Sequence, residues 1–178
     1  MIIGLTGYAQ SGKDTLANIL VEEYGFKRVA FADKIRQFLY EVNPMVGCSP
    51  SGYLKDLVDL IGWDAAKQEP QVRRLLQDLG VGARKVFGED FWVKQALGIH
   101  KPWENVVVTD VRFTNEADYL KGFPESQLWR VKRNGVHPVN AHVSESQMDG
   151  YHVDQIFTNN GSIEDLKTLI QTRMASLV

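Results

Sequence analysis

A glycine-rich segment near the N-terminus has the residues and spacing of a phosphate-binding loop. Residues 7–13 read Gly-Tyr-Ala-Gln-Ser-Gly-Lys, which matches the pattern G-x-x-x-x-G-K. Glycines let backbone N–H groups turn inward around a phosphate, and a helix that begins at the lysine adds positive partial charge. A glycine turn that binds nothing is the alternative, and the lysine disfavours it. The predicted phosphate-binding residues are Gly7, Ala9, Gln10, Ser11, Gly12, Lys13, Asp14 and Thr15.

Two acidic residues are candidates for holding Mg²⁺, directly or through water. Asp14 stands where a serine or threonine usually follows the lysine, and Thr15 comes next. A carboxylate at a helix N-terminus is also stabilised by the helix dipole alone, and the residues favour neither role. Asp110 ends the apolar run 106–109, as in a Walker B strand, and a turn or capping role is its alternative. Arg112, two residues on, can approach the phosphates or pair with Asp110.

Phosphate transfer also needs cations, because the charge on the transferred group must be neutralised. Arg74 and Gln77 are three residues apart and share a helix face, which can offer a guanidinium to a monophosphate and an amide to a base. Arg36 follows Asp33 at the same spacing, where a local ion pair is the plain alternative. Trp92 can stack on a base, but packing in the core has at least equal weight.

The composition excludes several other classes of protein. The chain has 178 residues, of which 44% are hydrophobic, so one compact domain with a real core is expected rather than a disordered chain. A net charge of −2 does not indicate a nucleic-acid binder. The single Cys48 favours a reducing compartment, and neither a membrane span nor a signal peptide is evident, so we expect a cytoplasmic location. No zinc-ligand spacing and no G-x-S-x-G hydrolase motif occur.

Short apolar runs alternate with helical patterns along the chain. The strands are expected at residues 1–5, 26–31, 105–109, 128–132 and 155–158. Helical periodicity is found around residues 16–20, 35–42, 54–61, 72–79, 90–97, 115–121 and 162–170. Strands separated by helices predict an α/β fold with a mostly parallel sheet.

Three segments refine this organisation. Residues 32–104 are helical and interrupt the alternation, so we expect an insertion on one side of the active-site crevice. Residues 134–150 are polar and form a long loop, a length that is usually functional or mobile. Ser162 opens the last helix with Asp165 as its capping-box partner. The side of that helix predicted to be buried carries Ile163, Leu166 and Ile170.

The sequence resembles the phage-type deoxynucleoside monophosphate kinases, a branch of the P-loop nucleoside monophosphate kinase fold. The matching segments follow the order of the family and span nearly the whole chain. They are GLTGYAQSGKDT at 4–15, VAFADKIR at 29–36, RRLLQDLG at 73–80, EDFWV at 89–93, VVVTDVRFTNEAD at 106–118, WRVKRNG at 129–135, HVSES at 142–146 and DQIFTNNGSIEDL at 154–166.

This resemblance implies that MgATP phosphorylates a deoxynucleoside 5'-monophosphate to its diphosphate. It implies one kinase domain over residues 1–178, with a five-stranded sheet, a helical substrate-binding insertion at 32–104 and a lid-like loop at 134–150. The implied catalytic residues are Lys13, Arg130 and Arg133, and Asn160 and Gly161 would edge the adenine. The implied acceptor-side residues are Asp33, Arg36, Arg74, Gln77, Trp92 and Arg112. The expected partners are ATP and a dNMP, without stable nucleic acid or membrane, in a monomer or homodimer.

Two rival functions remain open at this stage. One is a dephospho-CoA kinase-like enzyme, whose acceptor is a sugar hydroxyl. A hydroxyl needs a general base, and Asp33 would be that base. The other rival is a non-enzymatic module that binds ATP without transferring phosphate.

Overall fold

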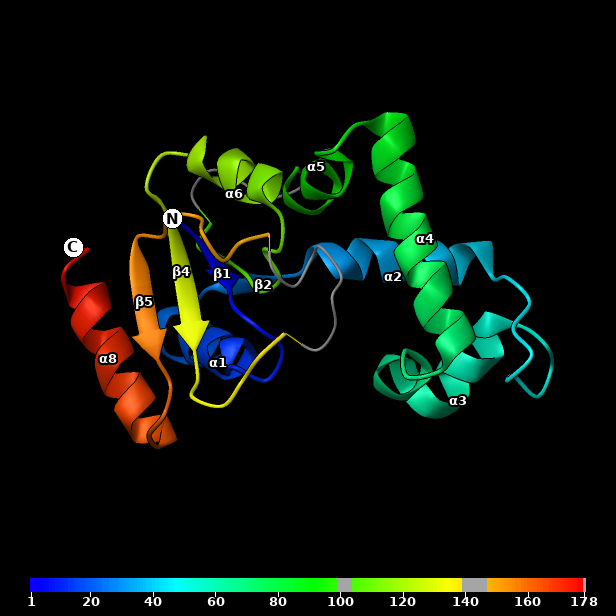
Figure 1. The fold of residues 1–178 in the computed structure, drawn as a ribbon, viewed down its shortest axis with the longest axis horizontal. Helices are drawn as coiled ribbons and strands as arrows, with labels where there is room; N and C mark the ends of the chain where they lie inside the picture. The colour runs from blue at the N-terminus through cyan, green and yellow to red at the C-terminus, as the bar shows by residue number, and fades with distance from the viewer. Residues whose placement is uncertain (99–103, 139–146, 178) are drawn as a thin grey trace. The chain divides into compact units, whose positions relative to one another are not determined.

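The computed structural model describes residues 1–98, 104–138 and 147–177. The chain divides into two compact units (Figure 1). The sheet unit comprises Met1–Ala30 and Ile99–Val178, and the helical unit comprises Phe31–Gly98. Part of the loop expected at 134–150 therefore lies outside the described residues. No helix in the described part of the chain is both long and apolar enough to cross a membrane.

Five parallel strands form the sheet of the sheet unit. They are β1 (Ile2–Thr6), β2 (Lys27–Val29), β3 (Val106–Val108), β4 (Ser126–Lys132) and β5 (Gln155–Thr158). Their order is β2-β3-β1-β4-β5, so β1 is central, with Ile3 opposite Val107 and Thr6 opposite Arg130. The predicted α/β fold with a parallel five-stranded sheet is confirmed. Because the strands are parallel, their carboxyl ends meet at one edge, where ligands bind in such sheets.

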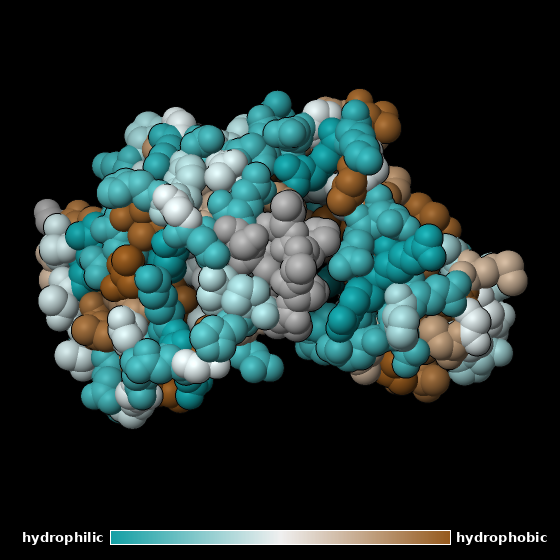
Figure 2. Space-filling view, viewed as in Figure 1, coloured by the Kyte–Doolittle hydropathy of each residue, from teal (hydrophilic) through white to brown (hydrophobic). Residues whose placement is uncertain are grey.

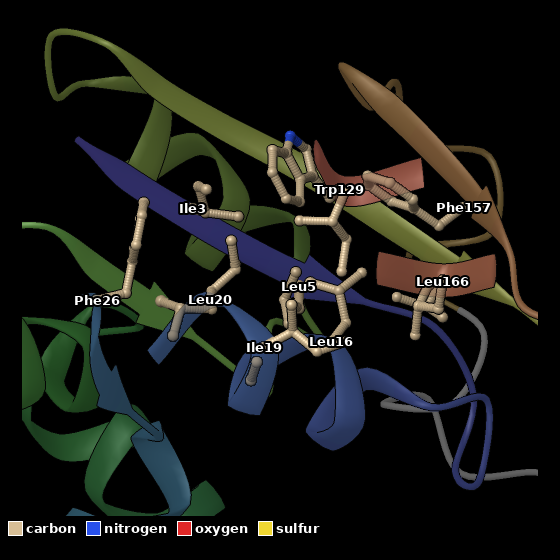
Figure 3. Close-up of a cluster of buried hydrophobic side chains, with 13 residues drawn as sticks. Ile3, Leu5, Leu16, Ile19, Leu20, Phe26, Trp129, Phe157 and Leu166 are labelled. Carbon is tan, nitrogen blue, oxygen red and sulfur yellow. The ribbon is translucent and has the colours of Figure 1, made fainter. Parts of the chain in front are cut away.

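Three helices cover the two faces of this sheet (Figure 1): α1 (Lys13–Tyr24), α6 (Thr114–Lys121) and α8 (Ile163–Ala175). The side chains of Ile3 and Leu5 point to one face, and Gly4 between them lies against Leu120 of α6. Helices α1 and α8 bury their apolar faces on the first side. The core there contains Ile3, Leu5, Leu16, Ile19, Leu20, Phe26, Trp129, Phe157, Leu166 and Ile170 (Figure 3). The buried face predicted for α1 is thereby confirmed.

Two local expectations are corrected in this unit, and one is confirmed. The strand expected over 26–31 is shorter, because Phe31 already begins the next helix. Ile163 is 59% exposed, since it lies in the first turn of α8 and only Leu166 and Ile170 face the core. The capping box is present: the Ser162 hydroxyl accepts from the Asp165 N–H, and the Asp165 carboxylate accepts from the Ser162 N–H at 2.8 Å.

The described part of the helical unit contains α2 (Phe31–Val42), α3 (Leu54–Ala66), α4 (Pro70–Phe87) and α5 (Phe91–Leu97). Its core cluster consists of Leu39, Val46, Leu54, Leu57, Val58, Ala66 and Val72. The unit covers most of the expected insertion at 32–104, although Glu104 belongs to the sheet unit. A role in substrate binding for this unit stays a prediction.

Helical periodicity predicted the helices of this unit better than it predicted their burial. Phe38 and Val42, which belong to the predicted stripe of α2, are about half exposed, and Ile61 of α3 is also exposed. Hydrophilic residues cover most of the face shown in Figure 2, with hydrophobic residues in small groups between them. Gly62 breaks the regular geometry of α3 with a φ of 75°, a value that glycine adopts without steric cost.

Candidate active site

The phosphate loop connects the central strand β1 to α1, and two of its glycines are required by its geometry. Gly7 has a φ of 135° and Gly12 a φ of 103°. A Cβ atom on Gly7 would lie 2.3 Å from the carbonyl oxygen of Val131, and one on Gly12 would lie 2.1 Å from Asn159 Nδ2. The same Nδ2 donates to the Ser11 carbonyl at 3.0 Å. The loop is therefore held tightly against the ends of β4 and β5.

Lys13 and Ser11 place polar groups at this loop. Lys13 Nζ lies 2.7 Å from the carbonyl oxygens of both Gly7 and Tyr8, so its charge lies across the loop. The Ser11 side chain is buried, and among the described residues its hydroxyl has no hydrogen-bond partner. A buried hydroxyl without a partner is costly, and a phosphate oxygen would satisfy it. The cradle therefore fits a nucleotide phosphate.

A cavity of about 440 Å³ opens beside the loop, entirely within the sheet unit. Its lining is strongly basic, because five of the lining residues carry positive charge and one, Asp149, is acidic. The basic residues are Lys13, Arg112, Arg130, Lys132 and Arg133. A concave basic site attracts anions such as a triphosphate. Of the residues predicted to contact phosphate, Gly7, Ala9, Ser11 and Lys13 line the cavity, and their contact with phosphate stays a prediction.

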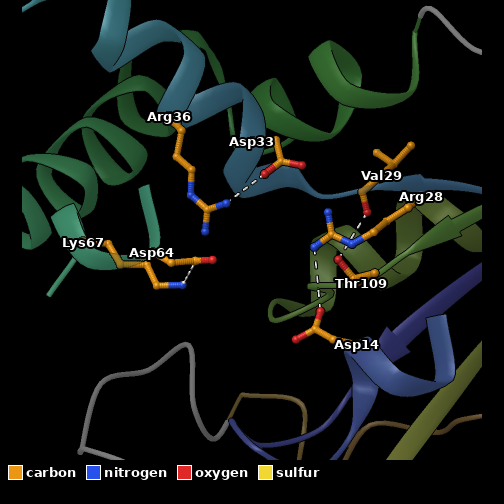
Figure 4. A network of polar contacts seen from close by, with 8 residues as sticks. All are labelled: Asp14, Arg28, Val29, Asp33, Arg36, Asp64, Lys67 and Thr109. Atoms are coloured by element: carbon orange, nitrogen blue, oxygen red, sulfur yellow. Dashed lines mark hydrogen bonds and ion pairs between the residues drawn. The ribbon is translucent and has the colours of Figure 1, made fainter. Parts of the chain in front are cut away.

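The Mg²⁺ candidates lie at the same edge of the sheet. Asp14 is exposed, and its Oδ1 is 3.7 Å from a guanidinium nitrogen of Arg28 (Figure 4). Asp110 directly follows Thr109, whose N–H and hydroxyl both donate to the Val29 carbonyl, at 3.0 and 3.4 Å. Among the described residues, no group of three or more His, Cys, Asp or Glu side chains could hold a metal ion by itself. Carboxylate and hydroxyl oxygens nevertheless suit Mg²⁺, which keeps waters and substrate oxygens as its other ligands.

Glu116 is a buried carboxylate that the sequence analysis did not single out. It accepts hydrogen bonds from the N–H groups of Arg112 at 2.7 Å and of Phe113 at 3.0 Å. These bonds fix the backbone immediately after Asp110, so that Arg112 lines the phosphate cavity in the sheet unit. The signal that could have identified Glu116 in the sequence was its position: an acidic residue in the first turn of a helix that follows a Walker B-like strand.

The two predicted phosphate-clamping arginines differ in their surroundings. Arg133 is exposed and lines the cavity. Arg130 also lines it, but its guanidinium donates to the carbonyl oxygens of the turn at residues 148–151. Asn160, expected beside the adenine, uses its side-chain oxygen to accept from the Asn134 N–H at 2.8 Å, and Gly161 follows it before α8.

The acceptor-side candidates in the helical unit have local partners. Asp33 and Arg36 form an ion pair at 2.9 Å (Figure 4). Arg74 is 84% exposed, with Nε 3.5 Å from Asp78 Oδ2, one helical turn along α4. Gln77 is exposed on the same helix.

Trp92 occupies a packing position in the helical unit. Its side chain is 5% exposed, and its indole N–H donates to the Gly80 carbonyl at 3.0 Å. It also contacts Phe38 and Phe91 edge-on. A tryptophan that is buried and hydrogen-bonded in this way is satisfied without a ligand. The geometry therefore favours the core-packing alternative over stacking on a base.

Comparisons with known proteins agree with this site. Residues 54–170, well over half of the chain, match the family model described as deoxynucleotide monophosphate kinase. A protein of Acanthamoeba polyphaga mimivirus, provisionally named deoxynucleotide monophosphate kinase, is 27% identical over 96% of this chain and 94% of its own. The deoxynucleotide monophosphate kinase of Escherichia phage RB69 is 30% identical over 56% of this chain and 43% of its own length.

A solved structure with a similar fold is the dephospho-CoA kinase of Campylobacter jejuni. It has a TM-score of 0.50 and 13% sequence identity, and the similarity covers 99% of this chain and 96% of that one. At this identity the likeness shows the fold alone. The phosphate loop, the basic cavity at the strand ends and the family match lead to one assignment: the chain belongs to the deoxynucleotide monophosphate kinase family, whose members are phosphate-transferring enzymes.

Proposed function

We propose that this protein transfers the γ-phosphate of ATP to the phosphate of a deoxynucleoside 5'-monophosphate, which yields the deoxynucleoside diphosphate and ADP. The observation that carries the proposal is the phosphate loop, in which Lys13 and the unpartnered Ser11 hydroxyl face a basic cavity. Family membership supports the choice of a nucleotide as acceptor.

The reaction needs no general base on the protein. A nucleoside monophosphate is largely a dianion near pH 7, because the second pKa of a phosphate monoester is about 6. One of its oxygens forms a bond to the γ-phosphorus, and the bond from that phosphorus to the β,γ-bridging oxygen breaks, leaving its electrons on ADP. Catalysis then consists of positioning and charge neutralisation. In this proposal Lys13, Arg112 and Arg133 supply positive charge at the cavity.

Mg²⁺ is the metal that this chemistry calls for. Asp14, Thr15 and Asp110 are the residues that would hold it, directly or through water. A bound Mg²⁺ would supply positive charge that offsets the charge of the triphosphate. The exposed carboxylate of Asp14 is available for this role only if its 3.7 Å contact with Arg28 is not essential to the fold.

The acceptor is proposed to bind in the helical unit. The charged and amide groups of Asp33, Arg36, Arg74 and Gln77 are the candidates there. Arg36 and Arg74 each have a carboxylate partner on their own helix, and a monophosphate would compete with that partner for the guanidinium. Trp92 would support these helices from the core rather than stack on the base.

The test is ADP formation from MgATP with a panel of acceptors: the four common dNMPs, the corresponding rNMPs and dephospho-CoA. The proposal expects stimulation by one or more dNMPs, with rNMPs weaker. Stimulation by dephospho-CoA alone would instead indicate a hydroxyl acceptor. If ATP binds and no acceptor is phosphorylated, the protein is a binding module and the proposal is wrong.

A further inference from the structure

Met148 and Asp149, in a turn at residues 148–151, line the cavity beside the phosphate loop, and one arginine makes three hydrogen bonds to this turn. Arg130 of β4 donates to three backbone carbonyls of this turn: that of Met148, that of Asp149 at 3.1 Å and that of Tyr151 at 3.0 Å. The Tyr151 N–H closes the turn on the Met148 carbonyl at 3.1 Å, and the Met148 side chain is buried. The guanidinium thus holds the turn in place against the sheet.

The same turn also contacts the phosphate loop. The Tyr8 hydroxyl donates to Asp149 Oδ1 at 2.8 Å, across 141 positions in the sequence. Through its carbonyl oxygen, Tyr8 accepts from Lys13 Nζ at 2.7 Å and from the Ser11 N–H at 3.2 Å. Tyr8 therefore links the turn to the Lys13 ammonium and to the backbone of Ser11.

We propose that the Tyr8–Asp149 hydrogen bond is a tether that preorganises the phosphate loop for nucleotide binding, and that Arg130 is the positioning residue that holds the tether's far end. The inference rests on the proposed function only in taking the loop as a nucleotide site. The loop includes Gln10 at a φ of 65°, a left-handed conformation that costs free energy for a residue with a side chain. Contacts that hold such a loop in place before the ligand arrives reduce the ordering cost of binding.

The negative charge of Asp149 indicates that its hydrogen bond to Tyr8 is the reason for a carboxylate at this position. A carboxylate on the wall of a cavity that binds an anion weakens the binding by repulsion. Asp149 is nevertheless the acidic residue among the described lining residues, and its oxygen is used by Tyr8. A hydrogen bond to an ionised acceptor is stronger than one to a neutral acceptor, so the carboxylate gives the firmer anchor. The gain in nucleotide affinity that Asp149 gives by holding the loop must exceed the loss caused by its repulsion of the phosphates.

The first experiment measures equilibrium binding of ADP and of tripolyphosphate by titration calorimetry. Tyr8→Phe and Asp149→Ala should each weaken binding of both ligands by roughly threefold to tenfold, the size of one partly exposed hydrogen bond. The double variant should bind no worse than either single variant, because both remove the same contact. Tyr151→Phe is the matched control, since it removes the Tyr151–Asp118 hydrogen bond from the same turn without touching the phosphate loop. Additive losses, or an equal loss in Tyr151→Phe, would overturn the tether.

The second experiment separates the hydrogen bond from the charge. Asp149→Asn keeps an oxygen that can accept from Tyr8 and removes the negative charge, so it should bind ADP markedly better than Asp149→Ala. In steady-state assays the tether variants should raise the KM for ATP and leave kcat nearly unchanged. If Asp149→Asn binds as weakly as Asp149→Ala, an acceptor oxygen at this position does not hold the loop, and the tether is wrong.

The tether and the proposed function can fail separately. Coupled losses of ADP affinity in a chain that phosphorylates no dNMP would support the tether and refute the choice of acceptor. If the unaltered chain bound neither ADP nor tripolyphosphate, both would be refuted.

Discussion

The two units of this protein present their candidate residues in different ways. In the sheet unit, residues distant in sequence converge on one cavity, where Lys13, Arg112 and Arg133 meet at the ends of parallel strands. In the helical unit, Asp33 pairs with Arg36 and Arg74 with Asp78, each within one turn of its own helix. Parallel strand ends bring distant residues together, whereas a helix face offers partners mainly at i+3 and i+4. In the proposed function, the donor side is thus prebuilt, while the acceptor side has charged groups that a substrate would have to draw away from their local partners.

The largest loss of activity is expected on substitution of Lys13, in the cavity of the sheet unit. Lys13→Ala should lower kcat/KM by roughly a hundredfold to a thousandfold, because a preorganised charge aimed at the transferred phosphate is lost. The fold should persist, since the ammonium donates to two backbone carbonyls of the loop, which water can satisfy in its place. Lys27→Ala, which removes an exposed ion pair with Glu104, is the matched control and should retain activity. Near-normal turnover in Lys13→Ala would show that the donor site lies elsewhere.

The next prediction tests the packing role of Trp92 by its effect on the free energy of unfolding. Trp92→Ala should reduce the free energy of unfolding by about 3–5 kcal/mol, because a large buried side chain is removed and a cavity remains. Trp92→Phe should lower the free energy of unfolding by less than Trp92→Ala and should leave the KM for the dNMP nearly unchanged. Denaturant unfolding combined with dNMP kinetics measures both. A dNMP KM that rises steeply in Trp92→Phe, with stability preserved, would restore the base-stacking role.

The phosphate loop can be strained without removing any charge. Gly12→Ala places a Cβ 2.1 Å from Asn159 Nδ2 at a φ of 103°, so we expect at least about 1–2 kcal/mol of destabilisation and weaker ATP binding. Gly25→Ala is the control: its φ is 68°, but no atom lies within 4 Å of the added Cβ. Gly25→Ala should lower the free energy of unfolding and leave the affinity for ATP unchanged. Equal ATP affinity in the two variants would contradict a tightly fitted loop.

A smaller effect is expected from Asp33, and it tests the acceptor side. Asp33→Asn should change kcat by no more than a few-fold, because a phosphate acceptor needs no general base. The KM for the dNMP should also change by no more than a few-fold, because the loss of a candidate acceptor contact at Asp33 and the release of Arg36 from its ion pair act in opposite directions. Steady-state kinetics with varied dNMP gives both values. A loss of most activity would instead favour a hydroxyl acceptor with Asp33 as its base.

The smallest effect concerns the cap of α8, which does not line the cavity. Hydrogen bonds from the Ser162 N–H and then from its hydroxyl hold the pKa of Asp165 below the ordinary value of 3.8. The carboxylate therefore stabilises the fold fully above pH 3.8, and that contribution disappears as the pH falls through the lowered pKa. Thermal unfolding should show Asp165→Asn as less stable at neutral pH, with the difference shrinking below pH 3.8. A difference that is constant with pH would contradict this.

The parts of the molecule that could be predicted are those specified by local pattern. The spacing of Gly7, Gly12 and Lys13 indicated the loop, and the apolar runs indicated the strands, because strand ends and glycine turns depend on nearby residues. The Ser162 capping box was equally local. The fold class followed from the alternation of these elements.

The contacts that could not be predicted join residues far apart in the chain. Nothing near Asn159 signals that its amide supports the Ser11 carbonyl, and nothing near Asp149 signals its bond to Tyr8. The family resemblance implied that Arg130 clamps phosphate, and in the structure its guanidinium donates to three carbonyls of one turn. Such partners are set by the order of the strands, which the sequence pattern does not reveal.

The most direct test of the account is to identify the product by phosphorus NMR after incubating the protein with MgATP and the best dNMP acceptor. The account predicts the two coupled phosphorus signals of a deoxynucleoside diphosphate, formed together with ADP and absent with Lys13→Ala. The appearance of free inorganic phosphate alone, or of a phosphate ester on a sugar hydroxyl, would contradict transfer to the acceptor's phosphate.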